Sequence, residues 1–162
     1  LEITEYFKSL GKQLDYLIIS VGGGGLISGV SSYVKQIFPY AKIIGVEPEG
    51  SKGMSDSLNL GRPLANVNVN SIADSLSAPL HMKYSFDVAK SVIDEMVTVS
   101  DDEMREQMLF AFNNLKLMLE PACVAGLAAI KYKLNKKLKD KNSLVILCGS
   151  NIDRITWQKL IN

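Results

Sequence analysis

Four consecutive glycines, Gly22 to Gly25, follow directly on the apolar run LDYLIISV at residues 14–21. Glycine lets successive backbone N–H groups converge on one point, and a helix that begins beyond the run adds positive potential. This combination is typical of a loop that binds a phosphate group. The alternative is a tight turn in which a helix packs closely on a strand. Four glycines at a strand end favour the anion site.

The phosphate could belong to more than one cofactor. Gly23-x-Gly25-x-x-x-Gly29 resembles the dinucleotide fingerprint with one residue added, and Glu47 follows about 20 residues later, where a ribose-binding carboxylate would lie. No other charged residue supports that interpretation, and Pro48 comes immediately after Glu47. A dinucleotide-binding domain therefore stays open as an alternative.

Two further segments could carry chemistry. Glu120 stands directly before Pro121, where a carboxylate often only compensates the dipole of a following helix. Cys148 opens the segment Cys-Gly-Ser-Asn after an apolar run; a cysteine there is usually buried packing, but it could also present its thiol to a ring nitrogen. His81, the only histidine, is expected to be an exposed or hydrogen-bonded loop residue.

The pattern of elements places these residues at strand ends. We expect strands at 14–21, 41–47, 96–99 and 143–148, and helices at 3–10, 26–38, 53–60, 85–95, from Ser100 onward and from Pro121 to about 134. Ser100 and Glu103 form a capping box, and Met104, Met108, Phe112 and Leu115 are expected on the core face of its helix. Strands alternating with helices predict an α/β fold with a mostly parallel sheet and helices on both faces. In such sheets ligands bind beyond the carboxyl ends of the strands.

Six motifs occur in a fixed order along the chain: VGGGGLISG, GVEPEG, IADSL, VSDDEM, LEPACVAGLAA and ILCGSN. In this order they resemble the serine/threonine dehydratase (threonine ammonia-lyase) and serine racemase family, which are fold-type II pyridoxal-phosphate enzymes. The resemblance spans nearly the whole chain. It favours pyridoxal 5′-phosphate over a dinucleotide as the cofactor.

The resemblance also implies roles for individual residues. The backbone N–H groups of Gly22, Gly23, Gly24, Gly25 and Leu26 would hold the cofactor phosphate. Cys148 corresponds to the Ser or Cys that faces the pyridine nitrogen, and Glu120 to a Glu near the ring. A neutral partner leaves that nitrogen unprotonated, which suits loss of a β-hydroxyl.

The implied reaction is deamination of L-threonine or L-serine by β-elimination, giving a 2-oxo acid and ammonia, with serine racemisation as the close alternative. The lysine that carries the cofactor as a Schiff base lies upstream of the glycine loop in this family, and no lysine here matches it. We therefore expect residues 1–162 to be one domain, the C-terminal part of the large cofactor-binding domain, without a catalytic residue of its own and inactive alone.

A metal site is not expected. Some relatives bind a divalent cation through a Glu at the position of Glu47, a nearby carbonyl such as that of Ser51, and an Asp. Gly53 stands at the position of that Asp, so Glu47 is then structural.

Bulk properties set the remaining expectations. The formal net charge of the 162 residues is +1, which gives no electrostatic case for nucleic acid or an anionic membrane. No apolar run reaches the roughly 18–20 residues that cross a bilayer. Two cysteines in apolar surroundings favour reduced thiols and a cytoplasmic protein. The lysine-rich segment at 131–141 is expected to be solvated, and the resemblance implies a homo-oligomer at full length.

Overall fold

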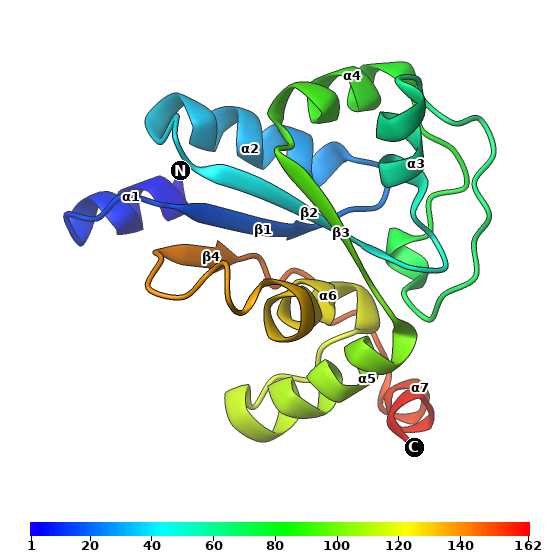
Figure 1. Ribbon diagram of the computed structural model, residues 1–162. Helices are drawn as coiled ribbons and strands as arrows, with labels where there is room; N and C mark the ends of the chain where they lie inside the picture. The colour runs from blue at the N-terminus through cyan, green and yellow to red at the C-terminus, as the bar shows by residue number, and fades with distance from the viewer.

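The computed structural model describes residues 1–162 and contains one sheet of four parallel strands in the order β3-β2-β1-β4 (Figure 1). The strands are β1 (Tyr16–Ser20), β2 (Lys42–Pro48), β3 (Glu95–Val99) and β4 (Ser143–Val145). Their apolar, β-branched sequences suit strands that are covered on both faces. The α/β class is confirmed, and the sheet is fully parallel where a mostly parallel one was expected.

Helices cover both faces of this sheet. On one face lie α1 (Glu2–Ser9), α2 (Gly25–Ile37), α3 (Gly53–Leu60) and α4 (Lys83–Val92), and their apolar side chains share a core cluster with Leu17 and Ile19 of β1. On the other face lie α5 (Asp101–Phe110), α6 (Pro121–Ala129) and α7 (Arg154–Ile161), which form a second cluster with Ile18. Alternate residues of β1 therefore point into two separate cores.

The strand order contains a reversal. The chain steps from β1 to β2 to β3 in one direction, then returns to place β4 on the other side of β1. The crevice between the carboxyl ends of β1 and β4 is consequently a topological switch point, the usual ligand position in open parallel sheets. Gly22 follows β1 and Cys148 follows β4, so both predicted site segments end at this point.

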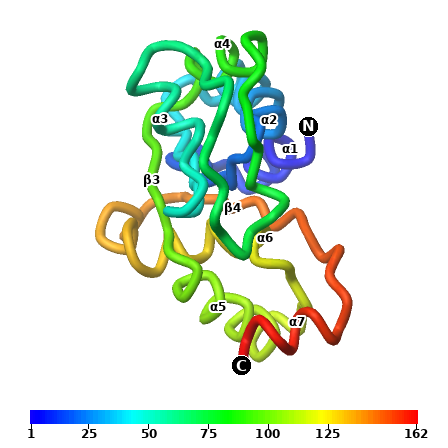
Figure 2. The backbone as a smooth tube through the Cα atoms, turned by 90° about the vertical axis from the view of Figure 1, so that its right-hand side faces the viewer, coloured from blue at the N-terminus to red at the C-terminus, as the bar shows by residue number.

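Residues 61–82 form the long connection between α3 and α4, on the side of the molecule that faces the viewer in Figure 2. A short 3₁₀ turn, Asp74–Leu76, is the only regular element in this connection. It places Ser75 and Leu76 against the glycine loop, because a Cβ on Gly22 would lie 3.2 Å from the Leu76 Cα and from the Ser75 carbonyl oxygen.

Several predicted boundaries differ from the structure. The helix expected at 85–95 lies at 83–92, because the Asp94 carboxylate accepts a hydrogen bond from the Ile43 N–H (2.8 Å) and fixes the chain beside β2. The regular part of β4 ends at Val145, three residues before the predicted end. The helix expected at 53–60 has the predicted bounds.

The predicted core face of α5 is wrong at its C-terminal end. Met104 and Met108 are fully buried, but Phe112 and Leu115 are exposed and Ala111 is buried instead. Residues Ala111–Leu115 form a π-helical turn, which has more residues per turn than an α-helix and so rotates the following side chains out of the α-helical stripe. A second π-helical turn, Ile130–Leu134, ends the helix predicted to run from Pro121 to about 134.

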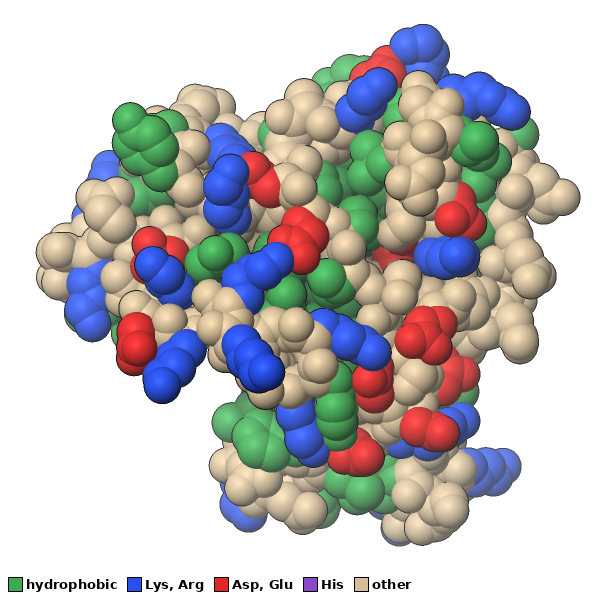
Figure 3. Space-filling model, viewed as in Figure 1, with side chains coloured by type: hydrophobic (Ala, Val, Ile, Leu, Met, Phe, Trp, Pro, Cys, Tyr) green, Lys and Arg blue, Asp and Glu red, His purple; other side chains and the backbone are tan.

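Charges of both signs are interspersed on the face drawn in Figure 3. Within the lysine-rich segment, three side chains pair with carboxylates: Lys131 with Glu106, Lys133 with Glu103, and Lys137 with Glu95. These lysines are partly solvated, as expected, and also connect the end of α6 to α5 and β3. None of the helices combines the length and apolarity that a membrane crossing would require.

Candidate functional site

A cavity of about 220 Å³ lies at the switch point between β1 and β4. It is lined by residues 20–27, which include the glycine loop, and by residues from three other parts of the chain. The lining residues are Ser20, Val21, Gly22, Gly23, Gly24, Gly25, Leu26, Ile27, Ser75, Leu76, Glu120, Ala122 and Cys148. Every residue predicted to bind the cofactor is therefore brought to one cavity; the binding itself stays a prediction.

The glycine loop forms an open anion cradle at the start of α2. Gly24 occupies the N-cap position with φ +87°, which a residue with a side chain rarely adopts, and no side chain caps the helix. The first turn of α2 also contains no acidic residue. A Cβ on Gly23 or Gly25 would meet no protein atom within 4 Å, so this side of the loop is open. The N–H groups that begin α2 are thus free of side-chain acceptors.

Glu120 organises the opposite wall of the cavity. It occupies the N-cap position of α6, but its side chain makes no capping hydrogen bond. Its Oε2 instead accepts a hydrogen bond from the Asn151 N–H at 3.1 Å, and its own N–H donates to the Gly149 carbonyl at 3.2 Å. A Cβ on Gly149 would lie 2.6 Å from the Glu120 Oε1. Glu120 therefore holds the segment after Cys148, and its carboxylate lies at the start of α6 without a hydrogen bond to that helix.

Cys148 presents a neutral thiol. Its side chain is exposed, which corrects the expectation that both cysteines lie in apolar surroundings, whereas Cys123 is buried in α6. Partial burial and the nearby negative charge of Glu120 raise the pKa of Cys148. Burial raises the pKa of Cys123 to about 12. Both cysteines are thiols rather than thiolates near neutral pH, so Cys148 can act as a weak hydrogen-bond donor.

Sequence reasoning missed two polar residues of the cavity, Ser20 and Ser75. Ser20 is the last residue of β1 and shares its face of the sheet with Ile18, which packs in the cluster containing α6. The period of two along a strand could have identified Ser20. Ser75 lies in the motif IADSL, which marked this segment, but only the path of the long connection decides which of its residues reaches the cavity.

Glu47 lies outside this cavity and acts as the cap of α3. Its Oε1 accepts a hydrogen bond from the Met54 N–H (2.6 Å), and its Oε2 accepts from the Ser55 N–H (2.9 Å) and hydroxyl (2.6 Å). The side chain is only 1% exposed, and burial raises the pKa of this carboxyl. Both oxygens are therefore engaged inside the protein. A ribose-binding Glu47, which the dinucleotide alternative requires, is incompatible with these contacts, and the structural role is the one observed.

His81 is a buried, hydrogen-bonded residue. Its Nδ1 lies 3.2 Å from the Ser57 Oγ, which also accepts a hydrogen bond from the Leu64 N–H at 3.1 Å. Which of the two groups donates in the contact between Ser57 and His81 depends on the imidazole tautomer. Burial lowers the pKa of His81, and a hydrogen bond with the Gly22 backbone partly opposes this. The imidazole is therefore neutral and packs behind the glycine loop.

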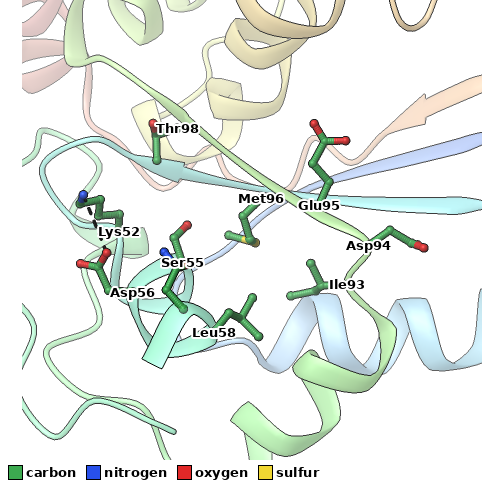
Figure 4. Close-up of a pocket in the computed structure, with 10 residues that line it drawn as sticks. Lys52, Ser55, Asp56, Leu58, Ile93, Asp94, Glu95, Met96 and Thr98 are labelled. Atoms are coloured by element: carbon green, nitrogen blue, oxygen red, sulfur yellow. Dashed lines mark ion pairs between the residues drawn. The ribbon is translucent and has the colours of Figure 1, made fainter. Parts of the chain in front are cut away.

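A larger cavity of about 540 Å³ lies between α3 and the edge strand β3 (Figure 4). Its charged groups already have partners: Lys52 pairs with Asp56, and Asp94 with Lys35 and Lys42. It shares no lining residue with the glycine-loop cavity. No predicted site residue lines this larger cavity, so the glycine-loop cavity remains the candidate site although it is smaller.

Comparison with known proteins identifies the family. Residues 1–149 match the protein family described as pyridoxal-phosphate dependent enzyme. This chain belongs to that family. Phenylserine dehydratase of Ralstonia pickettii is 44% identical over 146 residues, which are 90% of this chain and 45% of that protein. The chain spans between 25% and 45% of the length of the curated relatives that it matches.

Solved structures agree with this assignment. The processed form of threonine deaminase isoform 2 from Solanum lycopersicum superimposes with a TM-score of 0.87 at 35% identity, over 97% of this chain and 46% of that one. Maize serine racemase gives a TM-score of 0.84 at 29% identity, over 96% and 50%. The resemblance found in the sequence motifs is therefore confirmed, and pyridoxal phosphate is the cofactor of the family.

The residues of the cavity fit this cofactor. The open side of Gly23 and Gly25 gives a phosphate group direct access to backbone N–H groups, as a phosphate at a helix N-terminus requires. The neutral thiol of Cys148 suits an unprotonated ring nitrogen, to which it can donate. An open glycine loop at a helix N-terminus and a neutral thiol thus line the same cavity.

Proposed function

We propose that the protein to which this chain belongs deaminates a β-hydroxy-α-amino acid, L-threonine or L-serine, by pyridoxal-phosphate-dependent β-elimination. The products are a 2-oxo acid and ammonia. The observation that carries the proposal is that the glycine cradle and the neutral thiol of Cys148 line one cavity. An acidic partner at the ring nitrogen, which would favour other reactions of this cofactor, is replaced here by a thiol whose pKa is raised.

Bound pyridoxal phosphate would supply stabilisation of negative charge at the substrate α-carbon, which favours departure of the hydroxyl from the neighbouring β-carbon. The residues of this chain bind and orient. The N–H groups of Gly22 to Gly25 and Leu26 hold the phosphate, and Cys148 contacts the ring nitrogen without protonating it. Glu120 fixes the segment that carries Cys148 through its contacts with Gly149 and Asn151.

The names of two relatives support the proposed substrate class. A phenylserine dehydratase and a threonine deaminase are both named for amino acids with a β-hydroxyl group. The shared chemistry is loss of that hydroxyl, so a β-hydroxy-α-amino acid is the substrate class that we propose. The likeness to maize serine racemase favours racemisation as the second candidate, because it would use the same cavity.

We further propose that this chain by itself is inactive. No lysine lines the glycine-loop cavity, and the chain covers about half of its relatives' length. The lysine that binds the cofactor covalently and moves the α-proton then comes from residues upstream of Leu1 in the complete protein.

Borohydride reduction of the complete protein tests the cofactor and the position of the lysine. Digestion and mass spectrometry should find a pyridoxyl group on one lysine outside residues 1–162. A pyridoxyl-lysine within these residues would contradict the proposal that the lysine lies upstream of Leu1. Absence of any pyridoxyl-lysine would sink the proposed function itself.

Product analysis then tests the reaction. With L-threonine or L-serine, the complete protein should release a 2-oxo acid and an equal amount of ammonia, and residues 1–162 alone should release neither. D-serine in place of pyruvate would support the racemase alternative. L-alanine, which has no β-hydroxyl group, is the matched control substrate and should give no product.

A further inference from the structure

Ser20 is a buried polar residue for which the fold supplies no hydrogen-bond partner. Its side chain is 8% exposed, and its hydroxyl makes no hydrogen bond. Three other buried polar atoms share this property, on Ser31, Ser51 and Gln107. Of these four residues, Ser20 alone lines the glycine-loop cavity. A buried hydroxyl without a partner is destabilising, so its retention at a ligand cavity indicates a partner in the bound state.

The sheet register locates Ser20 within the cavity. Ile18 pairs with Val145 in the parallel ladder, and the Ile146 N–H donates to the Ile18 carbonyl at 3.1 Å. Continuing this register by two residues brings Ser20 beside Leu147, directly before Cys148. Alternation along β1 points the Ser20 side chain to the face of the sheet that carries α6 and Glu120. Ser20 therefore lies on the sheet face that carries Glu120, beside the segment that leads into Cys148.

We propose that Ser20 is an additional cofactor-binding residue, whose hydroxyl donates a hydrogen bond to the ring end of the bound pyridoxal phosphate beside Cys148. The inference rests on the proposed function, since it takes the cavity as the cofactor site. A hydroxyl is a stronger hydrogen-bond donor than a thiol, so Ser20 supplies the firmer neutral contact at this end of the site.

Calorimetric titration of the complete protein, after removal of its cofactor, tests the inference with two probes. The first is 4′-deoxypyridoxine 5′-phosphate, which keeps the ring and the phosphate but has no aldehyde to react with a lysine. The second is inorganic phosphate, which reports the glycine loop alone. Ser20→Ala should weaken binding of the first probe by about 3- to 10-fold, the effect of one neutral hydrogen bond, and leave phosphate binding unchanged.

Ser31→Ala is the matched control, because Ser31 is also buried and unpartnered but lies in α2 outside the cavity. It should change neither affinity. Thermal unfolding without ligand separates binding from structure: Ser20→Ala should be as stable as the wild type or more so, because the removed hydroxyl has no partner in the fold. A lower stability of the ligand-free variant would mean that Ser20 has a structural role and would overturn the inference.

The binding results discriminate further. Equal loss of both probes would place Ser20 at the phosphate and overturn its assignment to the ring end. Unchanged binding of both probes would exclude any contact. If the wild-type protein binds neither probe, the proposed function fails with it; if the wild type binds both and only the Ser20 result disagrees, the proposed function stands and this inference alone fails.

Discussion

At the scale of single residues, the candidate site depends on backbone more than on side chains. Gly22 is pressed against the backbone of Ser75 and Leu76, while Gly23 and Gly25 leave open space where a side chain would lie. Glycine therefore serves two different purposes in one loop: close packing on one side and access for a ligand on the other.

Gly23→Ala separates these two purposes. A Cβ at Gly23 would meet no protein atom within 4 Å, so the variant should fold with unchanged or slightly raised stability. The same methyl group would occupy the space proposed for the phosphate, and affinity for inorganic phosphate should fall at least tenfold. Calorimetry and urea unfolding measure the two effects.

Gly29→Ala is the control for Gly23→Ala. Gly29 lies inside α2, where an added Cβ also meets no atom within 4 Å, and it does not line the cavity. This variant should be more stable by about 0.5–1 kcal/mol because alanine favours helix, with phosphate affinity unchanged. Retained phosphate affinity in Gly23→Ala would show that the open side of the loop is not the binding surface.

At the scale of elements, the helix N-termini differ in how their N–H groups are satisfied. The side chains of Ser100 and Asp153 cap α5 and α7. The Glu47 side chain, from β2, accepts a hydrogen bond from the Met54 N–H in the first turn of α3. The start of α2 has no such acceptor. The starts of α1, α4 and α6 have no side-chain cap either, but α2 begins in the glycine loop that lines the cavity, so its unsatisfied donors and positive potential are available to the phosphate that we propose.

Ser100→Ala tests the cap of α5. The Ser100 Oγ accepts a hydrogen bond from the Glu103 N–H (3.2 Å), and the Glu103 carboxylate accepts one from the Ser100 N–H (2.9 Å). Loss of the hydroxyl should lower the free energy of unfolding by about 1 kcal/mol, within the range for N-caps. Urea unfolding measures this, and Ser91→Ala, at an exposed helical serine, should cost much less. Equal effects of the two variants would contradict a capping role.

At the scale of the whole molecule, the reversal of strand order creates the cavity, and the long connection supplies one of its walls. The glycine loop, residues 75 and 76, and residues 120 and 148 meet only because β4 returns to the side of β1. His81 joins this arrangement from the long connection, bonding to Ser57 of α3 and to the Gly22 backbone. Its neutral state therefore contributes to the stability of the folded chain.

Titration of His81 should appear as a pH dependence of stability. Burial lowers the pKa of His81, so the unfolded chain binds this proton more readily than the folded one. The contribution is complete above the unfolded pKa of about 6.5 and is lost as the pH falls through the folded pKa. The free energy of unfolding should thus decrease from about pH 7.5 to about pH 5.5 in the wild type.

His81→Asn provides the comparison, because His81 is the only histidine and the amide does not titrate. The carboxylates titrate in both proteins, so the difference between the two pH profiles isolates the imidazole. Urea unfolding of His81→Asn should vary less over this pH range than unfolding of the wild type. Parallel profiles would mean that the histidine pKa is not lowered by folding.

Local sequence determined a large part of this protein. Apolar β-branched runs predicted all four strands, the capping box predicted the start of α5, and the glycines predicted an anion cradle at a strand end. These signals are local, because side-chain period, backbone freedom and capping act over a few residues. The family motifs added the cofactor.

Tertiary structure alone decided the contacts between distant residues. Glu47 caps α3, Glu120 holds the segment after Cys148, and Ser75 reaches the cavity from the long connection between α3 and α4. Phe112 and Leu115 left the expected core face because a π-helical turn altered the period. The sequence pattern specifies which elements form, but the partner of a buried polar group depends on which strand lies beside which, and here the return of β4 to β1 decided that.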